Sequence, residues 1–427
     1  MSRLDRAGVT EWRRFWKLPA AAGLGYSIGV MHVYSLGAFM APLQEEFGWS
    51  RAEASLGLTI VGMAAAVAAL PIGLLVDRMG PRRVGITGVV LVGAAFALLG
   101  SATGSLANWI LLWAVLSFAS FWVQTTVWTS AVASRFDSSR GLAFAVTLSG
   151  GSLAAAVFPP LATTFIAAYG WRGAFVGLGL LWGALVVLAV ALFFRGAQDE
   201  RRAPPVDVAA AAPPPPLAGL TMRDGLRSAT FYRLLLAAGL FAFTTLGVVV
   251  HLVPILRDAG TDPLAAAGTA ALVGIFSIVG RLGIGVLLDR FPGRVVGACA
   301  YLVPIVGSAL LLFDGTDPVS QTVAAALFGL TLGAEVDVIA YLAARHFGIR
   351  NFGGLFGGLV AALSLGTAFG PLAAGAISDA TGGYGPFLIL TMTLMGLSSL
   401  ALASLRPPPD WTGAAEPDAA STLSPPP

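Results

Sequence analysis

Charged residues divide this chain into long intervals that are almost free of Asp, Glu, Lys and Arg. One interval covers 51 of the 427 residues and the others cover 19 to 31 residues each. They are 18–44, 54–76, 84–134, 141–171, 173–194, 234–256, 263–288, 295–313, 318–344, 351–378 and 380–405. A helix needs about 20 apolar residues to cross a bilayer, and Gly104 with Ser105 mark a turn that splits 84–134 in two. The sequence therefore predicts an all-α membrane protein with twelve transmembrane helices.

The composition excludes most soluble functions. Only 11% of the residues are charged, 56% are hydrophobic, and the mean hydropathy is +0.82. A soluble domain carries about 25% charge, so this chain cannot cover itself with a polar surface. The single cysteine, Cys299, excludes an internal disulfide, and the three histidines are far apart. We expect no metal, no cofactor, no nucleic-acid partner and no enzymatic activity, since no nucleophile–base or metal-ligand spacing stands out.

The basic residues predict the orientation of the chain. Lys and Arg accumulate in cytoplasmic loops. With the N-terminus inside, the outer loops hold only Arg51, Arg172 and Arg257, while every other basic residue except Arg281 lies inside. Both termini are therefore expected in the cytoplasm, and the pI of 9.3 is a topology signal. Interval 18–44 is too long for a signal peptide core and is expected to be retained. Arginine in place of lysine and abundant alanine favour a bacterial inner-membrane protein.

An internal repeat occurs at half the chain length. Segment 73–84 recurs as 285–296, and 170–175 is echoed by 382–387, both at an offset of 212 residues. Repetition at this period predicts two pseudo-symmetric six-helix bundles. The expected units are an N-terminal bundle (1–195), an extended Pro- and Ala-rich cytoplasmic linker (196–228), a C-terminal bundle (229–406) and an unstructured tail (407–427).

Twelve spans, a central linker and the G-x-L-x-D-R-x-G-x-R-R type of loop after the second span resemble the major facilitator superfamily. The resemblance implies two bundles that rock about a midplane site and give alternating access. The motif residues would then form a conformational latch. They are Gly73, Asp77, Arg78 and Arg82, with Asp289 and Arg290 in the repeat.

Three charged residues lie inside predicted spans. Arg281 is in the eighth, and Glu335 and Asp337 are in the tenth. A charge at bilayer depth costs roughly 2.5–3.5 kcal/mol, so these residues are paired, hydrated or functional. Glu335 and Asp337 point about 200° apart on a helix, so only one of them faces a central cavity; Asp337 is the preferred one. Arg281 either binds an anion, through its carboxylate-matching fork, or pairs structurally with one of the two acids.

The arginine in helix eight, the sequence 333–348 and Arg140-Gly141 at the start of helix five resemble bacterial members of the monocarboxylate transporter and oxalate/formate antiporter group. The resemblance implies transport of a small organic anion, usually with a proton, and a carboxylate bound to Arg281. Ser277 stands where animal monocarboxylate transporters place an Asp. Helix eleven lacks the lysine of the oxalate pattern, which favours a monocarboxylate over a dianion.

Softer candidates complete the expected site. Residues proposed to contact the substrate are Arg281, Ser277, His32, Tyr34, Gln124, Trp128, Ser149 and Tyr341. Asp337, Glu335 and His32 are the candidates for carrying a proton, because burial and imidazole chemistry favour such a role. His251 is expected at the rim of helix seven.

These features predict a monomeric secondary transporter for a small, lactate-like monocarboxylate, coupled to a proton. Two alternatives remain open. One is exchange of organic anions or efflux of a larger amphiphile without net proton movement. The other is a transporter-like sensor, which the lack of a sizeable soluble module disfavours.

Overall fold

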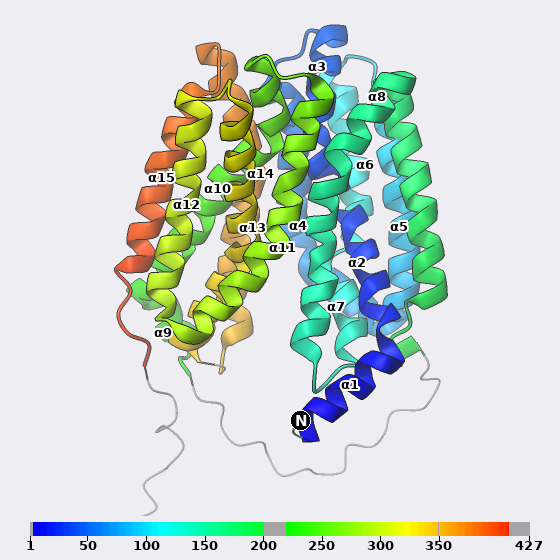
Figure 1. The fold of residues 1–427 in the computed structure, drawn as a ribbon. Coiled ribbons are helices and arrows are strands. Elements are labelled where there is room, and N and C mark those ends of the chain that lie inside the picture. The colour runs from blue at the N-terminus through cyan, green and yellow to red at the C-terminus, as the bar shows by residue number, and fades with distance from the viewer. Residues whose placement is uncertain (1–2, 200–218, 349, 410–427) are drawn as a thin grey trace, which may run out of the picture.

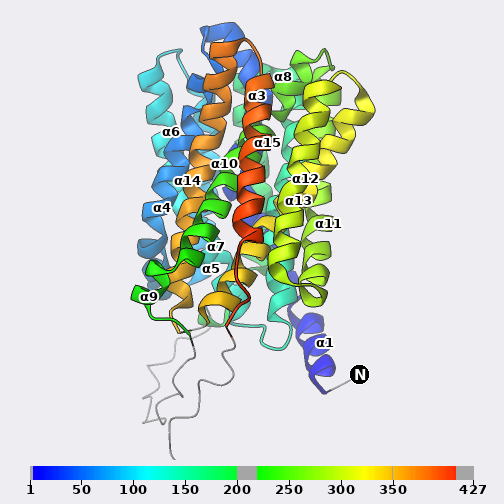
Figure 2. The same cartoon turned by 90° about the vertical axis from the view of Figure 1, so that its left-hand side faces the viewer.

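A computed structural model describes residues 3–199, 219–348 and 350–409; within them, the side chains of 3–7, 66–74, 77 and 198 are outside the description. Two helical bundles stand side by side (Figures 1 and 2). The first contains α1 (Arg3–Phe15), α2 (Lys17–Gly29), α3 (Met31–Phe47), α4 (Arg51–Met79), α5 (Pro81–Leu98), α6 (Leu106–Phe121), α7 (Thr125–Ala133) and α8 (Arg140–Phe193). The second contains α9 (Met222–Arg227), α10 (Ala229–Asp258), α11 (Pro263–Arg290), α12 (Gly293–Phe313), α13 (Pro318–Phe347), α14 (Phe352–Thr381) and α15 (Gly385–Ala403).

The prediction of twelve spans is confirmed. Ten helical segments of the described chain are long and apolar enough to cross a bilayer. One of them, α8, has 54 residues and turns back at Gly170, whose φ of 69° requires a glycine-like backbone. It therefore supplies two spans, and α4, with 29 residues, supplies another.

The repeat of 212 residues reappears as a repeat of structure. Helices α4, α5, α6 and α8 begin one repeat before α11, α12, α13 and α14. The left-handed turns at Gly48 and Gly170 correspond to those at Gly260 and Gly382. The Arg82 guanidinium donates to the Ala191 carbonyl at 2.6 Å, and its counterpart Arg294 donates to the Leu405 carbonyl at 3.0 Å. The two bundles are thus pseudo-symmetric, whereas their boundaries at 195 and 229 stay a prediction.

Two helices of the first bundle are interrupted where their counterparts are continuous. Val30, with φ −115° and ψ 7°, separates α2 from α3. Gln124, with ψ 152°, is the last residue of the break between α6 and α7. The equivalent residues of the second bundle, 242 and 336, lie inside the unbroken helices α10 and α13. The first bundle therefore exposes helix ends at mid-depth that the second bundle lacks.

A short helix precedes each bundle and packs on the equivalent loop. Glu11 of α1 accepts hydrogen bonds from the amides of Asp137, Ser138 and Ser139. In the second bundle, the Asn351 amide donates to the Leu220 carbonyl just before α9, at 2.9 Å.

The expectation of an extended linker over 196–228 is therefore too broad. Thr221 caps α9 by accepting from the Asp224 amide, and Asp199 accepts from the Gly196 and Arg82 amides. These side-chain hydrogen bonds order the two ends of the segment. Its high Pro and Ala content gave no indication of them. The proline runs at 204–205 and 213–216, and the tail beyond 409, lie outside the described residues.

Candidate functional site

A cavity of about 630 Å³ lies between the two bundles. Most of its wall is apolar, and its polar side chains come mainly from the first bundle. The polar and charged residues that line it are Tyr26, His32, Ser120, Gln124, Thr125, Thr126, Arg281, Ser364 and Thr367. The volume falls in the range typical of ligand pockets.

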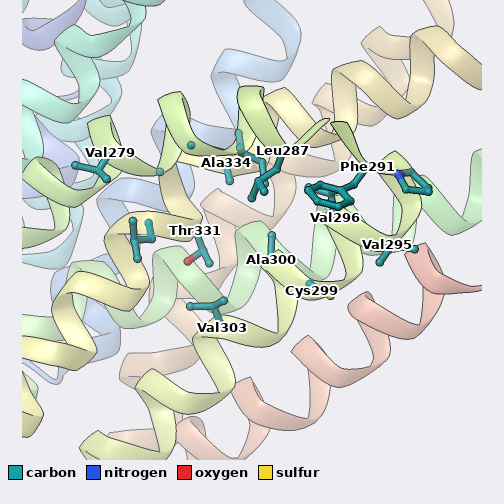
Figure 3. A pocket seen from close by; sticks show the side chains of 15 residues that line it. Val279, Leu287, Phe291, Val295, Val296, Cys299, Ala300, Val303, Thr331 and Ala334 are labelled. Carbon is teal, nitrogen blue, oxygen red and sulfur yellow. The ribbon is translucent and has the colours of Figure 1, made fainter. Parts of the chain in front are cut away.

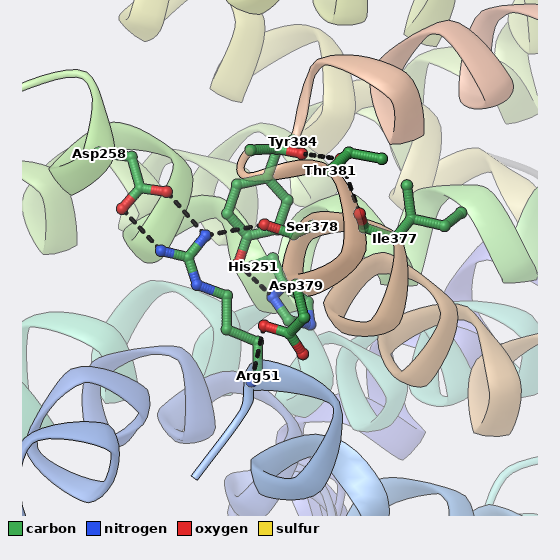
Figure 4. Close-up of polar contacts among 9 residues, drawn as sticks. Arg51, His251, Asp258, Ile377, Ser378, Asp379, Thr381 and Tyr384 are labelled. Carbon is green, nitrogen blue, oxygen red and sulfur yellow. Dashed lines mark hydrogen bonds and ion pairs between the residues drawn. The ribbon is translucent and has the colours of Figure 1, made fainter. Parts of the chain in front are cut away.

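Ties between the bundles close the cavity on the side opposite to the termini, and Figure 4 shows the side chains that form them. Arg51, at the start of α4, holds both carboxylate oxygens of Asp258 from α10, at 2.7 and 2.8 Å. It also donates to the Ser378 hydroxyl of α14 at 2.9 Å. The amides of Arg51 and Ala52 donate to the Asp379 carboxylate at 3.1 and 2.9 Å. The partial positive charge at the start of α4 and the side chain of Arg51 together bind α4 to α10 and α14 of the other bundle.

A second layer of contacts lies beneath these ties. His251 is fully buried, with Nδ1 2.7 Å from the Tyr384 hydroxyl and Nε2 2.9 Å from the Pro371 carbonyl. The Thr59 hydroxyl donates to the Ala368 carbonyl at 2.7 Å. The expectation that His251 is a rim residue is therefore wrong, because Tyr384 and Pro371 of its own bundle and Ser55 of the first bundle, 3.3 Å from its Nε2, enclose the ring.

The other end of the cavity reaches toward the side that carries the termini. Its lining includes Phe356, one turn from the start of α14, and Leu148, about two turns from the start of α8. Both helices begin on that side (Figure 1). The molecule is consequently in a conformation whose central chamber faces the termini.

Arg281 supplies the only full charge among the described residues that line the cavity. Its side chain is 17% exposed, and its Nη1 lies 3.8 Å from Oδ1 of Asp337, whose side chain is 35% exposed. The Nε–H has no hydrogen-bond partner within the described chain. Such a separation is a loose ion pair rather than a bidentate one, so the guanidinium keeps donors for a ligand.

The two acids of α13 occupy different surroundings. Asp337 lies beside Arg281, whereas Glu335 is 6% exposed and lies within electrostatic reach of Tyr301, Tyr34 and Arg281. Opposite faces of one helix produce this separation. Neither acid is among the residues that line the cavity, and Asp337 reaches it only through its loose contact with Arg281. Which acid faces the chamber, and the role of each, stays a prediction.

The break between α6 and α7 presents a second anion-attracting feature. Gln124, Thr125 and Thr126 line the cavity at the start of α7, which has no side-chain cap. The amides at a helix N-terminus carry a partial positive charge and bind anions. His32 lines the same chamber, and its Nδ1 is buried with no partner among the described residues. The first bundle thus contributes uncharged hydrogen-bond donors to the chamber, and the second bundle contributes the cation Arg281.

Of the eight predicted substrate contacts, the structure brings Arg281, His32 and Gln124 to the lining. The remaining predicted contacts lie elsewhere in this conformation. The Ser277 hydroxyl donates to Ser152 Oγ at 2.6 Å, and the Ser149 hydroxyl donates to the Ala145 carbonyl at 2.8 Å. Tyr34 packs between hydrophobic clusters of the two bundles, and Tyr341 packs beside Gly293.

Trp128 lies in the core of the first bundle rather than at the chamber. It is fully buried, and its indole N–H donates to the Val123 carbonyl at 2.9 Å. Its ring occupies the space that a side chain on Gly25 would fill. The missing side chain of Gly25, on the neighbouring helix α2, creates this space. The expected depth of Trp128 in the membrane could not predict it.

The predicted latch residues are only partly described. The surroundings of Gly73 and the side chain of Asp77 lie outside the description. Arg78, Asp289 and Arg290 are exposed. Arg82 ties α5 to the end of α8. The latch therefore stays a prediction. Sequence reasoning missed six polar lining residues, which are Tyr26, Ser120, Thr125, Thr126, Ser364 and Thr367. The signal available to find them was their polarity within otherwise apolar helices.

Comparison with known proteins gives a consistent result. Monocarboxylate transporter 13 of Rattus norvegicus is 31% identical over 379 residues, which are 87% of this chain and 82% of that protein. An uncharacterised MFS-type transporter of Escherichia coli K12, YhjX, is 24% identical over 80% of this chain and 83% of its own.

Solved structures share the fold. A bacterial homologue of the human lysosomal transporter Spinster, inward-facing and unoccupied, superposes with a TM-score of 0.66 at 18% identity, over 90% of this chain and 97% of that one. A point mutant of the nucleoside transporter NupG gives 0.68 at 13% identity, over 91% and 97%. A sequence model of the Major Facilitator Superfamily matches residues 22–335. The chain is therefore a multi-pass membrane transporter that belongs to the major facilitator superfamily.

Proposed function

We propose that the protein is a secondary active transporter of a small, lactate-like monocarboxylate, coupled to a proton. The observation that carries this proposal is the position of Arg281, a cation with free donors in the chamber between two bundles. A guanidinium matches the two oxygens of a carboxylate in a fork-like pair. The monocarboxylate transporters among the relatives support the same class of substrate.

The rest of the lining decides between substrate classes. No second Arg or Lys lines the chamber within the described chain, so one end of the solute is bound by charge and the other contacts apolar wall. Val30, Val33, Leu58 and Val61 provide that wall. A dianion would leave one carboxylate without a cation, at the cost of burying an unpaired charge. This arrangement favours a monocarboxylate with an apolar body.

Asp337 is the proposed proton carrier. It shares Arg281 through the loose contact of 3.8 Å. A substrate carboxylate that binds Arg281 competes with Asp337 for the same donors. The displaced aspartate then lies near a second negative charge, and binding a proton removes that repulsion. Binding of the solute and uptake of the proton are thereby linked at one arginine.

The orientation and assembly are further parts of the proposal. The distribution of arginines supports an orientation with the termini in the cytoplasm. The chamber described here then faces the cytoplasm, in the inner membrane of a bacterium. Each chain holds a complete chamber of its own, which supports a functional monomer.

The volume of the chamber favours a second candidate, exchange or efflux of a larger organic anion. At about 630 Å³ the chamber has room for a body much larger than that of lactate. Such a solute uses the same cation and does not require net proton movement.

Reconstitution into proteoliposomes tests the proposal. We expect a pH gradient, acidic outside, to drive uptake of labelled monocarboxylates and to acidify the lumen in step, with dicarboxylates transported poorly. Arg281→Ala removes the cation and is expected to abolish uptake, whereas Arg223→Ala, on the exposed surface of α9, keeps it. Uptake that needs an internal counter-substrate and leaves lumenal pH unchanged supports exchange. Normal uptake by Arg281→Ala overturns the assignment.

The two acids of α13 form a matched pair for the coupling step. We expect Asp337→Asn to keep downhill uptake and to lose stimulation by the pH gradient. Glu335→Gln, two residues away, is expected to keep that stimulation, since Glu335 is buried away from the loose pair. If only Glu335→Gln loses the stimulation by the pH gradient, Glu335 and not Asp337 carries the proton.

A further inference from the structure

A second cavity lies outside the central chamber, on the lipid-facing side of the second bundle (Figure 3). It has a volume of about 520 Å³ and runs between α11 and α12, with α13 as its floor. Val279 and Leu287 of α11, Phe291 of the connecting turn and Val295 of α12 form its walls, and all four are about half exposed. We call it the lateral groove.

The lateral groove offers almost no hydrogen-bonding capacity to a polar ligand, since the Cys299 thiol is only a weak donor. Thr331 carries the one hydroxyl in its lining, and that hydroxyl already donates to the Leu327 and Phe328 carbonyls. Gly280, Gly283, Ala300 and Ala334 keep the groove free of bulk. A Cβ at Gly283 would meet no atom within 4 Å. The shape and chemistry fit a flexible hydrocarbon chain.

The length of the lateral groove matches one leaflet. From Val279 to Leu287 the helix rises about 12 Å, at 1.5 Å per residue. Half of a bilayer's hydrocarbon core is about 15 Å thick. One end of the groove lies at mid-depth beside Leu330, and the other lies at the Phe291–Pro292 turn on the side that carries the termini. An acyl chain that enters at that surface would end near the bilayer centre.

Two arginines flank, in the sequence, the turn at the surface end of the lateral groove. Arg290 and Arg294 stand on either side of the turn, next to the acid Asp289. Arg290 is exposed, and Arg294 uses one Nη1–H on the Leu405 carbonyl, which leaves most of its five donors available. Basic groups between helix ends at this depth bind anionic headgroups. The surface end therefore carries a net positive charge where a lipid phosphate would lie.

We propose that the lateral groove is a binding site for an anionic phospholipid, with one acyl chain between α11 and α12 and the phosphate held by Arg290 and Arg294. The apolar lining, the one-leaflet length and the charge at the surface end converge on this ligand. The site is separate from the central chamber, but both share α11. Gly280 of that helix lines the groove, and the adjacent Arg281 lines the chamber.

Two glycines of α11 provide a matched test. Gly283 lines the groove and Gly285 does not, yet a Cβ added at either position would meet only open space. We expect Gly283→Leu to fill the groove and Gly285→Leu to leave it empty, with the same gain in helix propensity. The full-length proteins are purified from vesicles that contain equal phosphatidylglycerol and phosphatidylcholine, and retained lipid is counted by native mass spectrometry.

The wild-type protein and Gly285→Leu are expected to retain one phosphatidylglycerol, and Gly283→Leu to retain at least about fivefold less. Arg290→Gln is expected to reduce the preference for phosphatidylglycerol about fivefold, the effect of one basic group near an anionic surface. Arg78→Gln, its repeat counterpart in the first bundle, is expected to leave the preference unchanged. Equal retention by the two glycine variants, or equal binding of both lipids by the wild type, overturns the proposal.

Cys299 allows the same test without a variant. It is the only cysteine in the chain, it is exposed, and it lines the lateral groove. We expect added phosphatidylglycerol to slow its alkylation by N-ethylmaleimide in delipidated, detergent-solubilised protein at least about threefold, and phosphatidylcholine to slow it less. An alkylation rate that neither lipid changes would contradict occupation of the groove.

Discussion

The two bundles share a backbone plan and differ in what they place at the chamber. The second bundle contributes Arg281 to the lining, on the continuous helix α11, and holds Glu335 and Asp337 nearby on the continuous helix α13. One repeat earlier, the first bundle has Ala69, Val123 and Thr125 at the equivalent positions. At Val123 and Thr125 the helix is interrupted between α6 and α7. The first bundle therefore presents the backbone amides of a helix start to the chamber in place of charged side chains. The repeat therefore builds the framework, while departures from it create the site.

The closed end of the molecule follows the same rule. Glu46 of the first bundle pairs with Arg172 of its own bundle at 2.6 Å. Its repeat counterpart is Asp258, but Tyr384 replaces the arginine. Asp258 therefore pairs with Arg51 of the other bundle. One substitution between the repeats converts a tie within a bundle into a tie between bundles.

The largest expected effect comes from removing that tie between bundles. Arg51→Gln breaks the contacts to Asp258 and Ser378, and hydrogen bonds of a charged group contribute about 1.5–3 kcal/mol. The ratio of closed to open forms at this end should fall roughly tenfold to a hundredfold. Spin labels on E45C and L264C in a C299S background, read by double electron–electron resonance, would report a new long distance.

Arg172→Gln is the control for this prediction. It breaks the equivalent tie within one bundle, so we expect an unchanged distance distribution. If both variants shift the distances equally, the distinction between the two ties is wrong.

A smaller effect is expected from making the first bundle resemble the second. Thr125 is the counterpart of Asp337 and lies at the start of α7 in the chamber. Thr125→Asp places a carboxylate on the positive helix end, where it repels a substrate anion. We expect affinity for a monocarboxylate to fall about tenfold, with Thr125→Asn close to the wild type. Equal affinities of the two variants would show that α7 does not attract the solute.

The smallest effect concerns the helix before the first bundle. Burial alone would raise the pKa of Glu11. Hydrogen bonds from the Ser138 amide, the Ser139 hydroxyl and the Asp137 and Ser139 amides outweigh it and lower the pKa to about 2. The contact is therefore complete above about pH 4.5 and is lost only as the pH falls toward 2. Glu11→Gln should speed hydrogen exchange of these amides about fivefold, equivalent to roughly 1 kcal/mol.

The wild-type protection of these amides should not change between about pH 5 and pH 8, after correction for intrinsic exchange. A loss of protection near pH 5 would show that Glu11 has an ordinary carboxyl pKa and is not held by the loop.

The sequence was enough to predict the twelve spans, the repeat and the position of Arg281 at the chamber, because charged residues stand out against an apolar background. The role of Arg281 stays a prediction. The sequence did not reveal the breaks at Val30 and Gln124, since the interruption between α6 and α7 contains neither Pro nor Gly. In the sequence Arg51 is merely a loop arginine, although it joins the bundles in the structure. Trp128 has the depth of a chamber residue but fills a slot beside Gly25. Packing between distant segments decides such cases, and hydropathy does not encode it.

Calorimetric binding to purified protein tests the role of Arg281 most directly. The ligands are a monocarboxylate and its uncharged carboxamide, which have nearly the same shape, and the proteins are the wild type and Arg281→Gln. We predict that the wild type binds the carboxylate at least about 30-fold more tightly than the amide, since a charged, hydrogen-bonded pair contributes at least about 2 kcal/mol. Arg281→Gln should remove that difference. A preference for the carboxylate that survives in Arg281→Gln would contradict the account.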